Sequence, residues 1–143
     1  MRRATLAALL LLGACATTPR PGADPLALHK SFLVLDTHLD TPMHFARPGW
    51  SFGERHDPAT DLVQVDLKRM EDGALDGGFF AIYTDQGPLT SEGYATALAF
   101  ARGRSDLIDR TIASFPDRIG PALTAADARR LDREGRKIAF KSM

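Results

Sequence analysis

The chain of 143 residues has little cysteine, no net charge and no long hydrophobic run, and each absence excludes a class of protein. A single cysteine excludes an intramolecular disulfide and therefore a small disulfide-stapled fold. Basic and acidic residues number 18 each, so no surplus positive charge favours a nucleic-acid partner. No apolar stretch reaches the roughly 20 residues of a membrane-spanning helix. With 44% hydrophobic and 25% charged residues, the composition is typical of a globular domain.

The first residues indicate an export signal. Two arginines precede an apolar run over residues 4–12, and small residues follow as far as Cys15. Residues 12–15 (L-G-A-C), where the run ends, are similar to a bacterial lipobox. Residues 1–15 are therefore predicted to be a signal peptide, with Cys15 as the lipidated residue. Because Ala16 rather than aspartate follows, we expect an outer-membrane lipoprotein that faces the periplasm and is held at the membrane by its lipid anchor. The alternatives are an ordinary signal cleaved after Ala16, which gives a soluble periplasmic or secreted protein, and a twin-arginine export signal.

The segment after the signal is rich in proline. Residues 16–25 contain three prolines and a glycine, a composition that predicts a flexible tether. The folded domain is therefore expected over residues 26–143. Within that domain, strands are predicted at residues 31–37, 77–84 and 137–143, and helices at residues 67–72, 91–115 and 124–135.

Helix-capping residues support this assignment. Asp66 and Gly73 stand where the first helix should begin and end, and Thr124 with Asp127 approximates a capping box for the third. The long middle helix has an apolar stripe at helical spacing, made of Tyr94, Leu98, Ala101, Ile108, Ile112 and Phe115. Strands separated by helices predict a parallel sheet with right-handed crossovers, and the fold class is therefore α/β.

Ionisable residues cluster where the first predicted strand ends. The segment from Asp36 to Asp40 has the pattern D-x-H-x-D, and strand alternation would place Asp36, His38 and Asp40 on one face. Imidazole nitrogen and carboxylate oxygen suit zinc and similar divalent cations, and α/β folds build their sites at the carboxyl ends of strands. The pattern favours His38 and Asp40 as metal ligands, with Asp36 as a candidate to orient them. Alternatively, both aspartates are turn residues and His38 merely lies between them.

The other histidines carry a weaker signal. His29 precedes the first strand and His56 lies in a polar loop, and both are predicted to be surface residues. His44 is close to the candidate site and could line its pocket. Trp50 and Phe52 are expected to pack beneath the long loop that contains them, although they could also face a substrate.

Several motifs together resemble the membrane (renal) dipeptidase family of zinc peptidases. They are the D-x-H-x-D-x-P stretch at residues 36–42, Q-V-D-L-K-R-M at residues 64–70 and G-G-F-F-A at residues 77–81. Residues 124–127 with 135–139 are similar to that family's approach to its third strand. The motifs follow one another in the family's order and spacing, over most of the chain after residue 32.

The resemblance implies a (β/α)8 TIM barrel and a binuclear zinc hydrolase that cleaves dipeptides. The ligands that it transfers to this chain are His38 and Asp40, both on one of two expected zinc ions. It further implies a bridging glutamate after the third strand and two more histidines from later strands. In such a site two metals activate a bridging water, and the resulting hydroxide attacks the peptide carbon. Thr37 and Leu39 stand where the family usually has glycine and asparagine, and these departures bear on substrate preference more than on metal binding.

The motifs account for only the first three strand–helix units of a barrel, which typically takes about 250 residues. We therefore expect this chain to be the N-terminal portion of a longer enzyme. By itself this portion is expected to be inactive, because it has too few metal ligands. Glu134 is not expected to replace the bridging glutamate, because it precedes Gly135 at the opposite side of the sheet. The alternatives are a non-catalytic secreted or lipid-anchored remnant, a complete three-stranded α/β protein, and another amidohydrolase-like metal hydrolase. The last lacks its usual H-x-H pattern, because Asp40 takes the second position.

Overall fold

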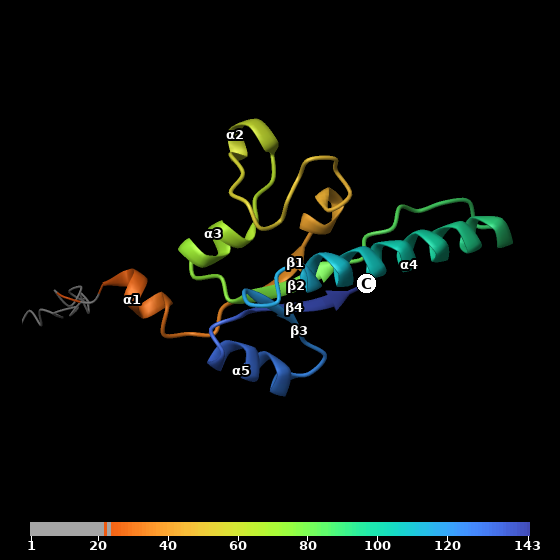
Figure 1. Ribbon diagram of the computed structural model, residues 1–143. Helices are drawn as coiled ribbons and strands as arrows, with labels where there is room; N and C mark the ends of the chain where they lie inside the picture. Colours follow the sequence, from red (N-terminus) through yellow and green to blue (C-terminus); the bar gives the residue numbers. More distant parts are fainter. Residues whose placement is uncertain (1–21, 23) are drawn as a thin grey trace, which may run out of the picture.

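The computed structural model describes Gly22 and residues 24–143 (Figure 1). The predicted signal segment with Cys15 lies outside the described residues, as does most of the predicted tether. The helices are α1 (Pro25–His29), the 3-10 helix η1 (Thr41–His44), α2 (Pro58–Asp61), α3 (Leu67–Asp72), α4 (Ser91–Ala113) and α5 (Ala125–Arg133), and the strands are β1 (Leu35–Leu39), β2 (Gly77–Ala81), β3 (Ile119–Pro121) and β4 (Lys137–Ser142). Within this described part, no helix is both long enough and apolar enough to cross a bilayer.

The four strands form one parallel sheet in the order β1-β2-β4-β3. The three predicted strands are therefore neighbours, as the α/β prediction requires. The fourth strand, β3, was not predicted, because its three residues include a glycine and a proline, which are uncommon inside strands. The first strand begins at Leu35 rather than at residue 31, since pairing with β2 starts opposite Gly77.

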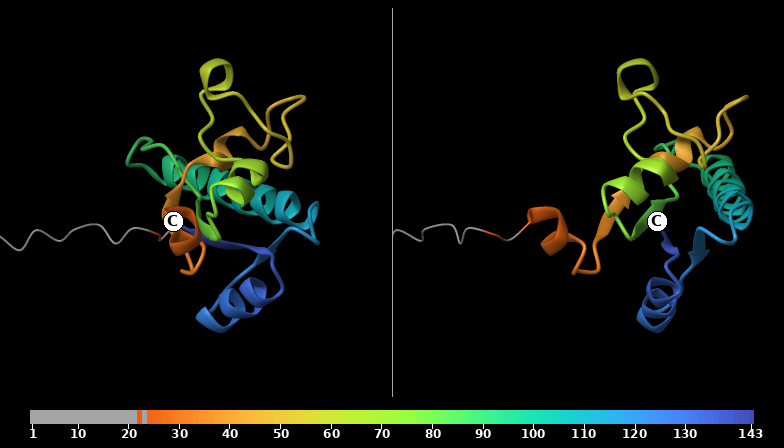
Figure 2. Two further views of the ribbon diagram at one scale, coloured as in Figure 1. Left: turned by 90° about the vertical axis from the view of Figure 1, so that its left-hand side faces the viewer. Right: turned by 60° about the vertical axis from the view of Figure 1, so that its left-hand side comes forward.

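Helices cover both faces of the sheet. Ile138 and Ala139 are successive residues of β4, so their side chains point to opposite faces, and each belongs to a different buried cluster. The cluster around Ala139 includes residues of α3 and α4, whereas the cluster around Ile138 includes residues of α5. The chain moves in one direction along the sheet up to β3 and then returns to β4. Right-handed crossovers therefore place α5 opposite α3 and α4, as Figure 2 shows.

The two glycines that open β2 permit a close approach of strands. A Cβ atom on Gly77 would lie 2.3 Å from the carbonyl oxygen of Ile138, and one on Gly78 would lie 2.9 Å from the carbonyl oxygen of Asp36. Any larger residue would therefore push β2 away from a neighbouring strand. This explains in physical terms why the motif at residues 77–81 begins with paired glycines.

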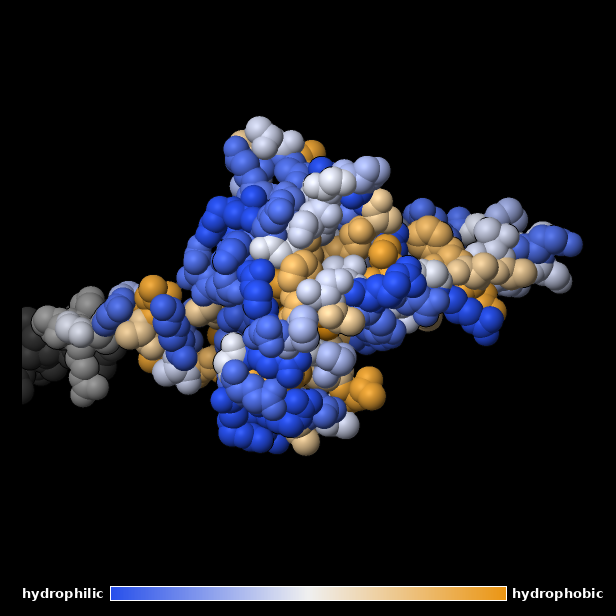
Figure 3. All heavy atoms as spheres, viewed as in Figure 1, coloured by the Kyte–Doolittle hydropathy of each residue, from blue (hydrophilic) through white to orange (hydrophobic). Residues whose placement is uncertain are grey.

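The long helix α4 is only partly packed on the sheet. Ala101, Ile108 and Ile112 of its predicted stripe are buried, but Tyr94 is 61% and Leu98 50% exposed. The first half of the stripe is therefore exposed, where the helix extends beyond the sheet (Figure 1). In Figure 3, hydrophobic surface continues from the sheet region along this helix.

The predicted helix caps are confirmed. The Asp66 carboxylate accepts the backbone N–H of Arg69 at the start of α3. Thr124 and Asp127 form a reciprocal capping box at the start of α5. Gly135 follows α5 with a φ of 70°, the left-handed conformation that suits glycine.

Candidate metal site

His38 lies near the carboxyl end of β1, and Asp40 follows that strand directly. In a parallel sheet the carboxyl ends of neighbouring strands meet at one edge, so His38 faces the ends of β2 and β4. A groove of about 680 Å³ lies there. It is lined by Thr37, His38, Ala81, Ile82, Tyr83, Thr84, Ala97, Leu98, Ala101, Ser142 and Met143.

The last part of β1 does not alternate regularly. The pairing with β2 advances by three residues between Asp36 and Leu39 but by only two on the partner strand, which is the count of a β-bulge. As a result, Leu35 packs with the cluster on the α5 face, while Leu39 is buried in the cluster on the opposite face. The prediction that Asp36, His38 and Asp40 alternate as in a regular strand is wrong at this bulge.

The bulge nevertheless brings the two predicted ligands together. His38 Nε2 lies 3.1 Å from Asp40 Oδ1, and the two side chains are 58% and 59% exposed. Within the described part of the chain, no group of three or more histidine, cysteine or acidic side chains is arranged to hold a metal ion. The pair is therefore a two-ligand arrangement open to solvent, and its role in metal binding stays a prediction.

Asp36 acts on His38 through the backbone. One of its carboxylate oxygens accepts the backbone N–H of His38 at 2.8 Å, across two residues. This local hydrogen bond stabilises the bulged backbone conformation at His38, as Asx turns do. Asp36 can therefore fix where the imidazole leaves the chain, although its hydrogen bond is to the backbone and not to the ring.

The segment after Asp40 is tied to the long helix. Arg104 of α4 donates a hydrogen bond to the carbonyl oxygen of Pro42, and both Thr41 and Pro42 are buried. The carbonyl of Asp40 accepts the N–H of Met43 at 3.0 Å. Arg104 thus holds the turn that follows Asp40, a role that no local sequence signal indicates because 62 residues separate it from Pro42.

The loop after η1 contains an aromatic and ionic cluster that the sequence did not reveal. His56 stacks on Trp50 with ring centroids 4.5 Å apart and lies 3.0 Å from an oxygen of Asp61. Only 13% of the His56 side chain is exposed, so the prediction of a surface residue is wrong. His56 is buried because its loop folds back onto Trp50 and Asp61, which the composition of the loop does not predict. Phe52 is 1% exposed, which confirms that it packs beneath the loop.

The remaining candidates lie away from the groove. His44 is not among the groove residues, and its ring centroid lies 5.9 Å from that of Trp50. Burial and, to a smaller extent, the charge of Arg47 lower the pKa of His44. His29 is half-exposed in α1. Glu134 ends α5 before the amino end of β4, where hydrogen bonds from Arg136 and Arg130 lower its pKa. It therefore lies at the opposite end of the sheet from His38, as expected.

Comparison with known proteins agrees with this architecture. A solved structure described as the probable dipeptidase PvdM from Pseudomonas aeruginosa matches with a TM-score of 0.68 and 26% identity, over 82% of this chain and 29% of that one. A second, described as dipeptidase AC, a metallopeptidase of family M19, matches in fold with a TM-score of 0.58 and 22% identity, over 76% of this chain and 33% of that one. The chain thus spans about a third or less of the length of these structures. No curated protein matches.

The family model for membrane dipeptidases covers the whole folded part of the chain. It matches residues 23–143, which include β1 with its two candidate ligands, all four strands of the sheet and the helices between them. The match begins close to residue 26, where the folded domain was predicted to start. The chain therefore belongs to the membrane dipeptidase family, peptidase family M19.

Proposed function

We propose that this chain supplies one part of the zinc site of a metallodipeptidase, with His38 and Asp40 as ligands. The observation that carries the proposal is the 3.1 Å approach of His38 Nε2 to Asp40 Oδ1 at the carboxyl ends of the strands. Family membership supports a dipeptidase-type metallopeptidase. The choice of zinc, and of two ions in a complete site, comes from the resemblance of the motif at residues 36–42 to that family.

The donor set fits the metal. Two ligands on one tetrahedral zinc, each at about 2.0–2.1 Å, lie about 3.3 Å from each other. The observed 3.1 Å is close to that separation, so both atoms could bind one ion with little rearrangement. When bound, a pair of zinc ions supplies Lewis acidity that polarises the scissile carbonyl and lowers the pKa of water at the site.

The chain's own residues would hold and enclose the substrate. His38 lines the groove, Asp40 Oδ1 lies 3.1 Å from His38 Nε2, and Asp36 keeps the His38 backbone in place. The volume of about 680 Å³ lies within the range of small-molecule sites and is large enough for a dipeptide. Thr37 lines the same groove, so its side chain would contact a substrate where the family usually has glycine.

A second reading is that these 143 residues bind metal without catalysing hydrolysis. Catalytic zinc sites normally use three protein ligands, and the described residues bring only two side chains together. Under this reading the isolated chain binds zinc weakly and is inactive towards dipeptides. Zinc-dependent hydrolysis of any member of a dipeptide panel by the purified chain would exclude this reading.

Zinc titration of the metal-free chain tests the ligand assignment. We expect the His38 imidazole signals in NMR spectra to shift on zinc addition, and the apparent affinity to fall at least about 10-fold in His38→Ala and in Asp40→Ala, because each removes one of two ligands. His29→Ala is the matched control, since it removes a half-exposed histidine outside the groove. Equal affinity in all four proteins would contradict the assignment.

We also propose that Cys15 is the lipidated residue of an exported lipoprotein anchored in the outer membrane. The support is the sequence pattern alone: a basic start, an apolar run and small residues up to the single cysteine. Radiolabelled palmitate should enter the wild-type protein in bacterial cells and be lost in Cys15→Ser. Label that persists in the variant would contradict the proposal, and a soluble periplasmic protein would then be expected.

A further inference from the structure

A second groove adjoins the groove that contains His38. It has a volume of about 420 Å³, and its lining residues lie between Thr84, after the end of β2, and Phe100, in the first turns of α4. Thr84 and Ala97 line both grooves, so the two grooves meet at these residues. A molecule bound beside His38 could therefore extend a side chain into the second groove.

The walls of the second groove are held in place by local contacts. The Thr90 hydroxyl accepts the N–H of Gly93 at 3.1 Å, and the Thr90 N–H donates to the carbonyl oxygen of Pro88 at 2.9 Å. A Cβ atom on Gly93 would lie 1.9 Å from the same Pro88 oxygen, so the loop packs directly against the helix. The loop and α4 therefore form a fixed frame, as is usual for small-molecule sites.

Thr84, where the two grooves meet, carries a hydroxyl group without a partner. Its Oγ1 atom is buried and makes no hydrogen bond within the described part of the chain. By contrast, the Thr90 hydroxyl caps α4, and the Thr96 hydroxyl donates to the carbonyl of Glu92 at 2.9 Å. A buried hydroxyl without a partner costs free energy, and folded proteins seldom leave one unsatisfied. A polar group of a bound molecule would supply the missing partner.

The second groove combines apolar surface with negative charge. Pro88, Ala97 and Phe100 provide the apolar surface, and Asp85 and Glu92 are exposed carboxylates. None of the described residues that line the groove is basic. A side chain with an aliphatic stem and a cationic end matches this lining, because its stem can pack on apolar surface while its charge stays near the carboxylates and water.

One basic residue lies near the apolar wall of the groove. The guanidinium carbon of Arg104 is 5.2 Å from the centroid of the Phe100 ring, but Arg104 is not among the lining residues. Its guanidinium donates to the carbonyl oxygen of Pro42. This cation is therefore engaged with the turn after Asp40.

We propose that the second groove is the subsite for one side chain of a dipeptide and that it prefers a basic side chain such as that of lysine. The Thr84 hydroxyl forms a hydrogen bond with the peptide where it passes from one groove into the other. The two carboxylates disfavour an acidic side chain. This inference rests on the proposed function, which places the dipeptide beside His38.

Dipeptide binding to the metal-free 143-residue protein tests the subsite without hydrolysis. Methyl NMR spectra are recorded during titration with Ala-Lys and Lys-Ala, and with the same pairs in which leucine or aspartate replaces lysine. We expect the Ala97 methyl signal to shift, whereas that of Ala128, buried on the α5 face, stays in place. In the preferred order, the lysine dipeptide should bind about 5-fold more tightly than its leucine counterpart, and the aspartate dipeptide should bind most weakly.

Thr84→Val separates a binding role from a structural one. Because the hydroxyl has no partner in the free protein, the variant should resist urea at least as well as the wild type, while its affinity for every dipeptide falls about 5-fold. Thr60→Val is the matched control, since its hydroxyl lies in α2, outside both grooves. Asp85→Asn combined with Glu92→Gln should reduce the affinity for the lysine dipeptide to that for the leucine dipeptide.

Three results would each overturn the proposal: an Ala97 signal that no dipeptide shifts, lysine dipeptides that bind no more tightly than leucine dipeptides, and unchanged affinity in Thr84→Val. If that variant does not fold, as judged by far-UV circular dichroism, nuclear Overhauser effects in the wild-type protein replace it. Contacts between the lysine methylenes and the Phe100 ring support the subsite, and their absence overturns it. No metal is present, so failure here is distinguishable from failure of the zinc titration, which bears on His38 and Asp40 alone.

Discussion

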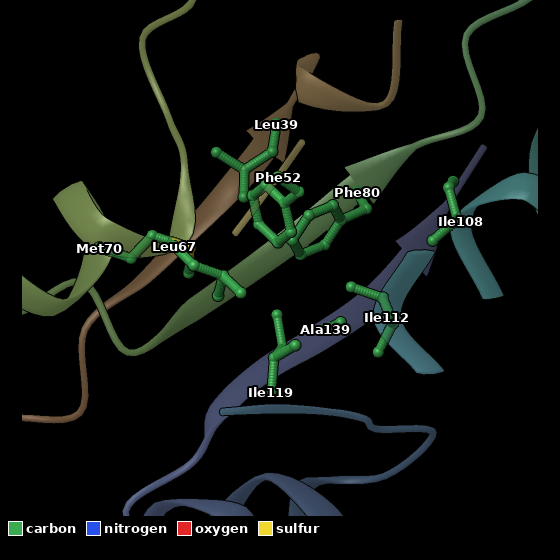
Figure 4. Close-up of a cluster of buried hydrophobic side chains, with 9 residues drawn as sticks. All are labelled: Leu39, Phe52, Leu67, Met70, Phe80, Ile108, Ile112, Ile119 and Ala139. Atoms are coloured by element: carbon green, nitrogen blue, oxygen red, sulfur yellow. The ribbon is translucent and has the colours of Figure 1, made fainter. Parts of the chain in front are cut away.

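Replacing Phe80 with alanine is expected to lower the free energy of unfolding by about 3–5 kcal/mol. Phe80 lies in the central strand β2 and its side chain is fully buried. Its ring meets the edge of Phe52 with centroids 5.8 Å apart and lies 6.3 Å from Phe45. Figure 4 shows it between side chains of α3 and α4. Truncation would leave a cavity at the point where the strands, the loop and both helices meet.

Phe79 offers a matched control because it directly precedes Phe80 and has the same side chain. It points to the other face of the sheet, is half-buried, and stacks on Phe140 with centroids 4.8 Å apart. We expect Phe79→Ala to cost about 1–2 kcal/mol, from partial burial and one aromatic pair. Urea unfolding followed by circular dichroism measures both variants. Equal losses would contradict the central position assigned to Phe80.

The sequence predicted those features that depend on neighbouring residues. The caps at Asp66 and Thr124 are determined by side chains that contact backbone three residues away, and both are confirmed. The helical period of residues 91–115 correctly indicates α4. It does not determine what the apolar face contacts, and Tyr94 is exposed because the described sheet ends before the helix does.

Features that depend on distant residues were missed. β3 is defined by its pairing with β4, and the hold of Arg104 on Pro42 spans 62 residues. None of these contacts leaves a periodic or local pattern in the chain. This is why residue types and strand ends indicated His38, Asp40 and the supporting Asp36, whereas the hold of Arg104 on the turn after Asp40 left no signal.

The 3.1 Å spacing of the candidate ligands depends on both local and long-range contacts. It depends on the bulge after Asp36, which a local hydrogen bond to His38 supports. It also depends on Gly78, where a Cβ would lie 2.7 Å from a methyl carbon of Leu39 and 2.9 Å from the carbonyl of Asp36. The glycine in the motif at residues 77–81 therefore leaves room for the bulge that carries the motif at residues 36–42. The two motifs are parts of one structural unit.

Asp66→Asn is expected to lower the free energy of unfolding by about 3–5 kcal/mol near neutral pH. The Asp66 side chain is fully buried and accepts the backbone N–H groups of His56, at 3.0 Å, and of Arg69, at 2.8 Å. The same carboxylate oxygen that binds His56 also accepts Arg69 Nε at 2.8 Å. Asparagine can replace one acceptor oxygen but places an NH₂ group against the other donors. The variant would leave the Arg69 guanidinium without its buried partner.

The loss of stability in Asp66→Asn is expected to become smaller as the pH falls. Burial is the largest single influence on Asp66 and opposes its ionisation, but the hydrogen bonds from His56 and Arg69 together outweigh it and lower its pKa. A carboxyl whose pKa is lower in the folded state stabilises the protein above its unfolded pKa, and this stabilisation is lost as the pH falls through the folded value. Asparagine does not titrate. The stability gap between wild type and Asp66→Asn should therefore narrow below about pH 4.

Urea unfolding of both proteins at pH 7 and at pH 3 measures that gap. Other carboxyls with lowered pKa values, such as Asp61 and Glu71, are common to both proteins and cancel in the difference. Asp24→Asn is the control, because Asp24 caps α1 through one exposed hydrogen bond and should change stability by less than about 1 kcal/mol. A gap that is the same at both pH values would show that Asp66 does not act through its charge. The expected narrowing would instead assign the aspartate of the Q-V-D-L-K-R-M motif to anchoring α3 beneath the loop through its charge.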